Sequence, residues 1–330
     1  MGIDSNGGIQ VNGKGESTFL QNIGEFFKQQ LILVALVVLV LLFGFTSPFF
    51  FSLTNLANIG RQTAQVSIIA CGMTLVIIAA QIDLSVGSVL SLAGMVAGLT
   101  IKVTGVTMLG VIAGLGLGAA VGLTNGLLTT KGKIPAFLTT LATMGIARGL
   151  TMMITQTKDV VIYREPYWKL FGDGELFHIP SQIVWTIIIA VITGFLLRKS
   201  IYGRRVYATG GNLEAARFSG IDTDKIIISV FTITGVLAAL SGIVLSSQMH
   251  TSRPHVGVGM ELNAIAAVIL GGTSLFGGKG SILGTIIGSL IIGVLNNGLL
   301  LLGFSSYFQM IIRGVVIILA VLILTKQSES

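Results

Sequence analysis

Residues 106–128 read VTMLGVIAGLGLGAAVGLTNGLL, a stretch without a charged side chain in which Gly recurs at every fourth position from Gly110 to Gly126. A helix that rises 1.5 Å per residue needs about 20 apolar residues to cross roughly 30 Å of hydrocarbon. Glycines spaced by four share one helix face, so another helix can approach the bare backbone there. The stretch therefore predicts a membrane-spanning helix inside a closely packed bundle.

The same composition extends over most of the chain. Of the 330 residues, 52% are apolar and 10% are charged, and the mean hydropathy is +0.91, whereas soluble domains are about 25% charged. These values exclude a soluble globular protein, a disordered chain and a secreted disulfide scaffold. We predict an all-α, polytopic membrane protein with about ten transmembrane helices, some of them short or broken. The expected spans are 31–45, 62–80, 84–101, 106–128, 134–156, 181–197, 226–248, 260–273, 281–302 and 305–325.

Charge divides the chain into regions with a predicted orientation. We expect a cytoplasmic tail over residues 1–30, a transmembrane domain over 31–325 and a cytoplasmic tail over 326–330. With the N-terminus inside, the inner segments hold twelve Lys and Arg residues and the outer segments hold six, in keeping with the positive-inside rule. The loop 157–180 is then outside and the basic loop 198–225 is cytoplasmic. The net charge of +7 orients these loops and does not indicate a nucleic-acid partner.

Asp83 is a carboxylate between two apolar stretches, in the sequence AQIDLSVGS of residues 80–88. A charged side chain at the bilayer centre costs about 2.5–3.5 kcal/mol on insertion scales, so it needs a role. In one interpretation it caps a short helix that begins below the membrane surface and accepts from the N–H groups of residues 84–86. In the other, Asp83 and Ser85 line a substrate path, as broken helices often do. The two roles are compatible.

Further polar side chains in the spans complete the candidate pathway. Glu261 and Asn263 follow the Gly-rich segment 256–259 and open the eighth span, where they either cap the helix or meet hydroxyl groups of a solute at the outer mouth. The remaining candidates are amides within spans, which either form hydrogen bonds between helices or bind a hydroxylated ligand. These amides are Asn125, Asn296, Asn297 and Gln309.

The cytoplasmic loop 198–225 contains a local helix signal. Asn212 is a good N-cap, Glu214 follows in the first turn, and Gly220 is a good C-cap. Together they predict a helix of about two turns outside the membrane. Such a short helix is not stable alone, so it needs a docking surface on this protein or on a partner.

The sequence contains no complete motif for nucleotide binding, catalysis or metal binding. Gly277-Gly278-Lys279-Gly280 is not a phosphate-binding loop, because Thr273 takes the place of the first Gly and Gly280 follows the Lys. A turn between two spans explains it. We find no Ser/His, Cys/His or paired-carboxylate set, and His178, His250 and His255 have no metal-ligand spacing. We therefore expect no catalytic residue, no metal site and no cofactor bound by this chain.

At the cytoplasmic loop the sequence resembles the permease subunits of bacterial ABC importers for monosaccharides, the ribose-type group. Glu214-Ala215-Ala216 followed by Gly220 is similar to the EAA loop that such permeases dock into their ATPase. The resemblance covers roughly residues 30–325, and Gln81 and Asn263 depart from its usual Gly and Asp, which leaves the sugar open. Four further stretches are similar to the family: Gly72–Ile77, Ile82–Gly87, Leu270–Gly280 and Asn296–Leu299.

The resemblance implies a transport machine of several chains in the inner membrane. This chain would be the multi-pass permease with both termini in the cytoplasm, and ATP and Mg²⁺ would be bound by a separate ATPase subunit. A second permease copy, an extracytoplasmic sugar-binding protein and a monosaccharide are the other implied partners. Movement would follow alternating access driven by ATP hydrolysis. By the resemblance, the residues for ATPase coupling are Gly210, Gly211, Asn212, Glu214, Ala215, Ala216 and Gly220.

An ion-coupled secondary transporter of a small polar solute is the alternative function. It needs a buried titratable relay or a cation site near the membrane midplane. Asp83 is the candidate for such a group, but this function leaves the predicted docking helix at Asn212 unexplained.

Overall fold

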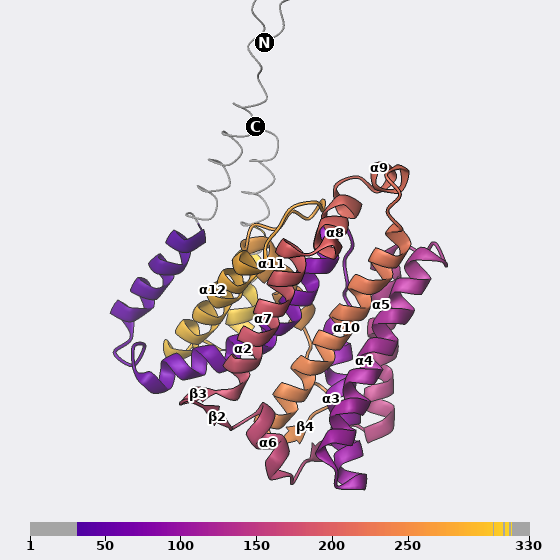
Figure 1. Ribbon diagram of the computed structural model, residues 1–330. Coiled ribbons are helices and arrows are strands. Elements are labelled where there is room, and N and C mark those ends of the chain that lie inside the picture. The colour runs from indigo at the N-terminus through magenta and orange to yellow at the C-terminus, as the bar shows by residue number, and fades with distance from the viewer. Residues whose placement is uncertain (1–31, 306, 313, 317, 319–330) are drawn as a thin grey trace, which may run out of the picture.

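The structure is a computed structural model that describes residues 32–305, 307–312, 314–316 and 318, and Figure 1 shows that these residues form an almost entirely helical protein. The prediction of an all-α, polytopic membrane protein is confirmed. Seven described helices are long and apolar enough to cross a membrane. They are α2 (Leu53–Ile78), α3 (Val86–Thr104), α4 (Thr107–Thr130), α5 (Ala136–Thr155), α7 (Ser181–Lys199), α10 (Thr223–Gln248) and α12 (Ile282–Leu301).

Three of the expected spans are shorter helices. These cover Ile32–Thr46, Met260–Leu270 (α11) and Tyr307–Val316. The eleven residues of α11 rise about 16 Å, roughly half of the hydrocarbon core. The helix count of ten therefore stays a prediction, and the expected short or broken helices are present. Residues 1–31 and 319–330, which include both predicted cytoplasmic tails, lie outside the described residues.

The start of the second expected span was wrong by nine residues. We predicted a start at residue 62, but α2 begins at Leu53. Ser52 explains the earlier start, because its side chain accepts a hydrogen bond of 3.3 Å from the backbone N–H of Asn55 and caps the helix. The polar side chains around Arg61 obscured this first part of the helix in the sequence.

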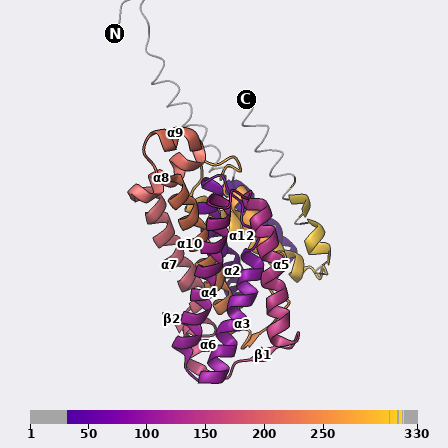
Figure 2. The same cartoon turned by 90° about the vertical axis from the view of Figure 1, so that its right-hand side faces the viewer.

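Short elements lie at the two ends of the bundle. At one end are α8 (Ile201–Gly211) and α9 (Leu213–Phe218), and at the opposite end are α6 (Glu165–Phe171) and the strands (Figures 1 and 2). The predicted loops 157–180 and 198–225 therefore lie at opposite ends, as the expected topology requires. The strands form two antiparallel pairs, β1 (Val160–Val161) with β4 (Thr251–Ser252) and β2 (Glu175–Leu176) with β3 (Ile179–Pro180).

Two 26-residue helices, α2 and α10, occupy the centre of the bundle. Within the most apolar stretch of each helix, 89% of residues are buried in α2 but only 22–28% in α4, α5 and α7. Helix α10 packs against α2, α3 and α4, and residues of α2, α3 and α10 contribute to two separate hydrophobic clusters. The outer helices α4, α5 and α7 thus expose much of their apolar surface, as expected for helices that face lipid or another chain.

The glycine strip of α4 packs as predicted, but against two helices. A methyl group on Gly110 or Gly114 would meet α3, whereas one on Gly118, Gly122 or Gly126 would meet the backbone of α10. The strip therefore lets α4 approach both α3 and α10 without side chains between them. The sequence has a second strip with the same spacing, Gly280, Gly284 and Gly288. Gly284 and Gly288 pack on α11 and the residue that follows it, but Gly280 precedes α12 and lies against the side chain of Thr273.

Two stretches of the chain have the same order of elements, a long helix, an irregular segment and two further helices of which the last carries a glycine strip. In the first, α2 leads through the irregular segment 79–85 into α3 and then into glycine-striped α4. In the second, α10 leads through 249–259 into α11 and then into glycine-striped α12. The second break meets the start of α3, directly after the first break, because a methyl group on either Gly87 or Gly257 would overlap the carbonyl oxygen of the other. The two breaks thus place the starts of α3 and α11 next to each other inside the protein.

Candidate transport site and coupling segment

Asp83 lies in the first break and is almost completely buried. Its Oδ1 accepts a hydrogen bond of 2.8 Å from the backbone N–H of Ser85 and one of 2.6 Å from the Ser85 hydroxyl. Since α3 starts at Val86, Asp83 holds the N-cap residue Ser85 instead of being the cap itself. The expected acceptor role is present, but the expected short helix is wrong, because α3 runs for 19 residues.

Asp83 and Ser85 belong to a buried polar chain that joins three helices. The Ser85 hydroxyl accepts a hydrogen bond of 3.0 Å from the side-chain nitrogen of Asn125 on α4. The side-chain oxygen of Asn125 in turn accepts a hydrogen bond of 2.7 Å from the hydroxyl of Thr143 on α5. Three predicted residues, Asp83, Ser85 and Asn125, are therefore brought together. Within a low-dielectric interior such a satisfied network fixes helix positions.

Glu261 lies at the second break, near the start of α3. Its Oε1 accepts a hydrogen bond of 3.2 Å from the backbone N–H of Gly259, the residue before α11, so it caps its own helix. Its Oε2 is buried against Gly87 in the first turn of α3 and has no hydrogen-bond partner among the described residues. Ser88, the next residue of α3, also has a buried hydroxyl without such a partner. The first turns of α3 and α11 thus hold a hydroxyl and a carboxylate oxygen that form no hydrogen bond within the described residues.

The other predicted pathway residues are dispersed. Asn297 forms two hydrogen bonds, of 3.0 and 2.9 Å, with the side chain of Asn55, and so joins α12 to α2. Gln309 donates to the carbonyl oxygen of Phe304 nearby in the sequence. Asn263 is buried one turn into α11, and Asn296 is half-buried on α12. None of these contacts brings the four amides to Asp83.

The predicted cytoplasmic helix is α9, between α8 and α10. Asn212 is its N-cap, and its side chain accepts a hydrogen bond of 2.9 Å from the backbone N–H of Ala215. Gly220 follows the helix end with a φ of +80°, a conformation that favours glycine. Glu214 and Ala215 are exposed, but Ala216 is buried against this protein's own body. Of the residues predicted for ATPase coupling, Ala216 therefore packs on this protein itself, because α9 turns that side inward.

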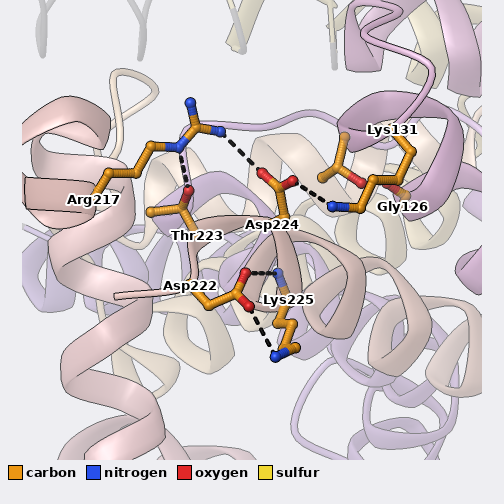
Figure 3. A network of polar contacts seen from close by, with 8 residues as sticks. Gly126, Lys131, Arg217, Asp222, Thr223, Asp224 and Lys225 are labelled. Carbon is orange, nitrogen blue, oxygen red and sulfur yellow. Dashed lines mark hydrogen bonds and ion pairs between the residues drawn. The ribbon is translucent and has the colours of Figure 1, made fainter. Parts of the chain in front are cut away.

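Charged side chains tie α9 to two long helices (Figure 3). Arg217 donates to the Thr223 hydroxyl at 2.8 Å and forms an ion pair of 2.9 Å with Asp224 at the start of α10. Lys131, directly after α4, forms an ion pair of 2.9 Å with the other oxygen of Asp224. Hydrogen bonds from Lys225 lower the pKa of the neighbouring Asp222 carboxyl, which caps α10 in its charged form. The segment is thus attached to both α4 and α10.

Sequence reasoning missed several members of these clusters. Thr143, Ser88 and Asn55 contribute polar groups, and Gly87 and Gly257 allow the second break to meet the start of α3. One signal for Thr143 was available, because Thr139, Thr140 and Thr143 form a polar face at helical spacing in an otherwise apolar span. The contact between Gly87 and Gly257 has no local signal.

The fold and these sites agree with a membrane permease. Residues 55–321 match the family described as "Branched-chain amino acid transport system / permease component". This match covers most of the chain, and the chain therefore belongs to that permease family and is a multi-pass membrane protein. The resemblance identified from the motifs is confirmed.

Similar proteins extend over nearly the whole chain. The ribose import permease protein RbsC of Escherichia coli (strain K12) is 45% identical over 302 residues, which cover 91% of this chain and 94% of that protein. RbsC of Bacillus subtilis (strain 168) is 44% identical over 312 residues, 94% of each chain. The L-arabinose transport system permease protein AraH of Escherichia coli (strain K12) is 37% identical over 314 residues, 95% of each. No solved structure matches this chain.

Proposed function

We propose that this chain is the membrane-spanning subunit of an ABC importer that carries a monosaccharide, ribose or a related sugar, across the inner membrane. The observation that supports this most is similarity over more than nine-tenths of the chain to permeases named for ribose, D-allose and L-arabinose. Similarity of that extent includes both helix breaks and the coupling segment, so it concerns the transport apparatus as a whole. Ribose is the sugar we propose first, because the permeases named for ribose have the higher identity to this chain.

The proposal assigns ATP hydrolysis to a separate subunit, which binds ATP and Mg²⁺ and docks on α9 at the cytoplasmic end. The exposed side of α9 supports this, since it presents Glu214, Ala215 and the apolar side chain of Phe218, which is 92% exposed. An exposed aromatic ring beside small residues suits a protein interface. A second permease copy and an extracytoplasmic sugar-binding protein complete the machine, and both termini of this chain lie in the cytoplasm.

Transport proceeds by alternating access around the two helix breaks. ATP binding closes the ATPase subunits, α9 moves with them, and the connected helices open the interior to one side and then to the other. Irregular backbone at membrane depth is tolerated where it is enclosed by protein or lines a solute path. The breaks at 79–85 and 249–259 are partly enclosed by protein and contribute buried polar side chains, such as Asp83 in the first and Ser252 in the second.

Glu261 and Ser88 are the groups we assign to sugar hydroxyls. Asp83, by contrast, already uses one oxygen for two hydrogen bonds to Ser85. A carboxylate accepts stronger hydrogen bonds from hydroxyls than a neutral amide does. Glu261→Gln keeps the size of the side chain and is expected to reduce sugar uptake about tenfold at normal expression, since about 1.4 kcal/mol corresponds to tenfold. Wild-type uptake by this variant would show that Glu261 does not bind the sugar.

Proteoliposomes test the function. The purified chain is reconstituted with candidate ATPase and sugar-binding subunits and supplied with labelled ribose, arabinose or allose. We expect uptake of one sugar that needs ATP and the binding protein together. Vesicles with ADP or without the binding protein are the controls. Uptake driven by a proton or sodium gradient without ATP would contradict the proposal and favour an ion-coupled transporter.

A further inference from the structure

Four glycines form the contact of the coupling segment, which consists of α8 and α9, with the end of α2 and the loop that follows α11. We call this set the glycine seat: Gly210, Gly211, Gly277 and Gly278. The first two end α8, and the last two lie in the loop 271–281 between α11 and α12. A methyl group on Gly210 would overlap the carbonyl oxygen of Ile78, the last residue of α2. The end of α8 is therefore in direct backbone contact with the end of α2.

The loop closes the seat from the other side. A methyl group on Gly277 would lie 2.6 Å from the carbonyl oxygen of Gly210, and one on Gly278 would lie 2.8 Å from the Cα of Gly211. Both loop glycines have positive φ, +85° and +70°, which other residues rarely adopt. The loop can therefore lie against α8 only because these positions are glycine.

Two hydrogen bonds hold the seat together. The backbone N–H of Gly278 donates to the carbonyl oxygen of Ile78 at 2.9 Å, which satisfies a carbonyl at a helix end that lacks a partner within the helix. The hydroxyl of Tyr207 on α8 donates to the carbonyl oxygen of Gly280 at 2.8 Å. The ends of α2 and α8 and the loop thus share one set of contacts.

The first helix break starts from this seat, and the second break, 249–259, is joined to it through α11. Residues 79–85 leave the end of α2 there and reach Asp83 and Ser85, whereas α11 ends at the loop and carries Glu261 at its other end. Side chains in an interface can change rotamer and absorb a displacement, but backbone pressed on backbone cannot. A shift of α8 is therefore passed to both breaks at once.

We propose that the glycine seat transmits movement of the α8–α9 segment to the segments that carry Asp83 and Glu261, with Gly210 as its key positioning residue. This inference rests on the proposed function, since it takes α8–α9 as the segment that the ATPase subunit moves. Gly210→Ala separates α8 from the end of α2, while α9 and its exposed face stay unchanged. The variant is therefore uncoupled: the ATPase subunit binds and hydrolyses ATP, but little sugar is carried.

The test measures three quantities in the reconstituted complex: copurification of the ATPase subunit, the rate of ATP hydrolysis and sugar uptake. For Gly210→Ala we expect copurification at the wild-type level, hydrolysis of at least half the wild-type rate, and uptake per ATP reduced at least tenfold. Gly116→Ala on α4 is the matched control, because that methyl group meets nothing within 4 Å in the described part of the chain. It should behave as wild type. Gly211→Ala, whose methyl group would meet Gly278 at 3.9 Å, should be affected less than Gly210→Ala.

A second variant keeps the inference testable if Gly210→Ala fails to fold. Tyr207→Phe adds no bulk but removes the hydroxyl that binds Gly280, and we expect uptake per ATP to fall two- to fivefold at unchanged ATPase binding. Wild-type uptake per ATP in both folded variants, or loss of ATPase binding together with hydrolysis, would overturn the inference. Failure of the proposed function looks different, because wild-type vesicles themselves would then show no ATP-dependent uptake.

Discussion

At the scale of single residues, the buried oxygen of Asp83 holds the start of α3 through its two hydrogen bonds to Ser85. Asparagine keeps an acceptor in that place, so we expect Asp83→Asn to insert and fold normally. It should lose part of the uptake, because a neutral amide holds Ser85 at the start of α3 less strongly than a carboxylate does. Asp83→Ala leaves the Ser85 N–H without this acceptor in a buried site, which costs about 1–3 kcal/mol. Thermal unfolding in detergent measures the difference, and an alanine variant as stable as wild type would contradict it.

At the scale of secondary structure, α9 is a six-residue helix whose start depends on the Asn212 side chain. Removing such a cap costs about 0.5–2 kcal/mol, so Asn212→Ala should speed hydrogen exchange of the amides in Leu213–Phe218 by about two- to thirtyfold. Asn212→Asp retains a capping oxygen and serves as the control, with exchange near wild type. Equal exchange in both variants would mean that the contacts of Ala216 and Arg217, and not the cap, maintain this helix.

At the scale of the whole molecule, α9 and the 157–180 segment lie at opposite ends of the bundle (Figure 1), and the distribution of Lys and Arg predicts that α9 is inside. Cysteine probes test this orientation in intact cells. Ser219→Cys should resist an impermeant thiol reagent, whereas Lys158→Cys should react. The native Cys71 is completely buried, so the background is low. Labelling of Ser219→Cys from outside would show that the orientation is opposite to the predicted one.

Features that depend on residues close together in the chain were predictable without the structure. Hydropathy located the apolar helices, since the apolar content of about 20 residues decides whether a helix suits the membrane. The Asn212 cap was predictable because donor and acceptor are three residues apart. The close packing of the Gly110–Gly126 strip followed from helical spacing alone. The family also followed from short local motifs.

Which polar groups meet depends on how the helices pack against one another. Asn125 and Asn297 look alike in sequence, yet Asn125 binds Ser85, 40 residues away, and Asn297 binds Asn55, 242 residues away. The inward side of Ala216 and the contact of Gly210 with Ile78 likewise depend on how separate helices pack. Such pairings are set by the relative positions of whole helices, because those positions decide which buried donor finds which acceptor, and no local pattern records them.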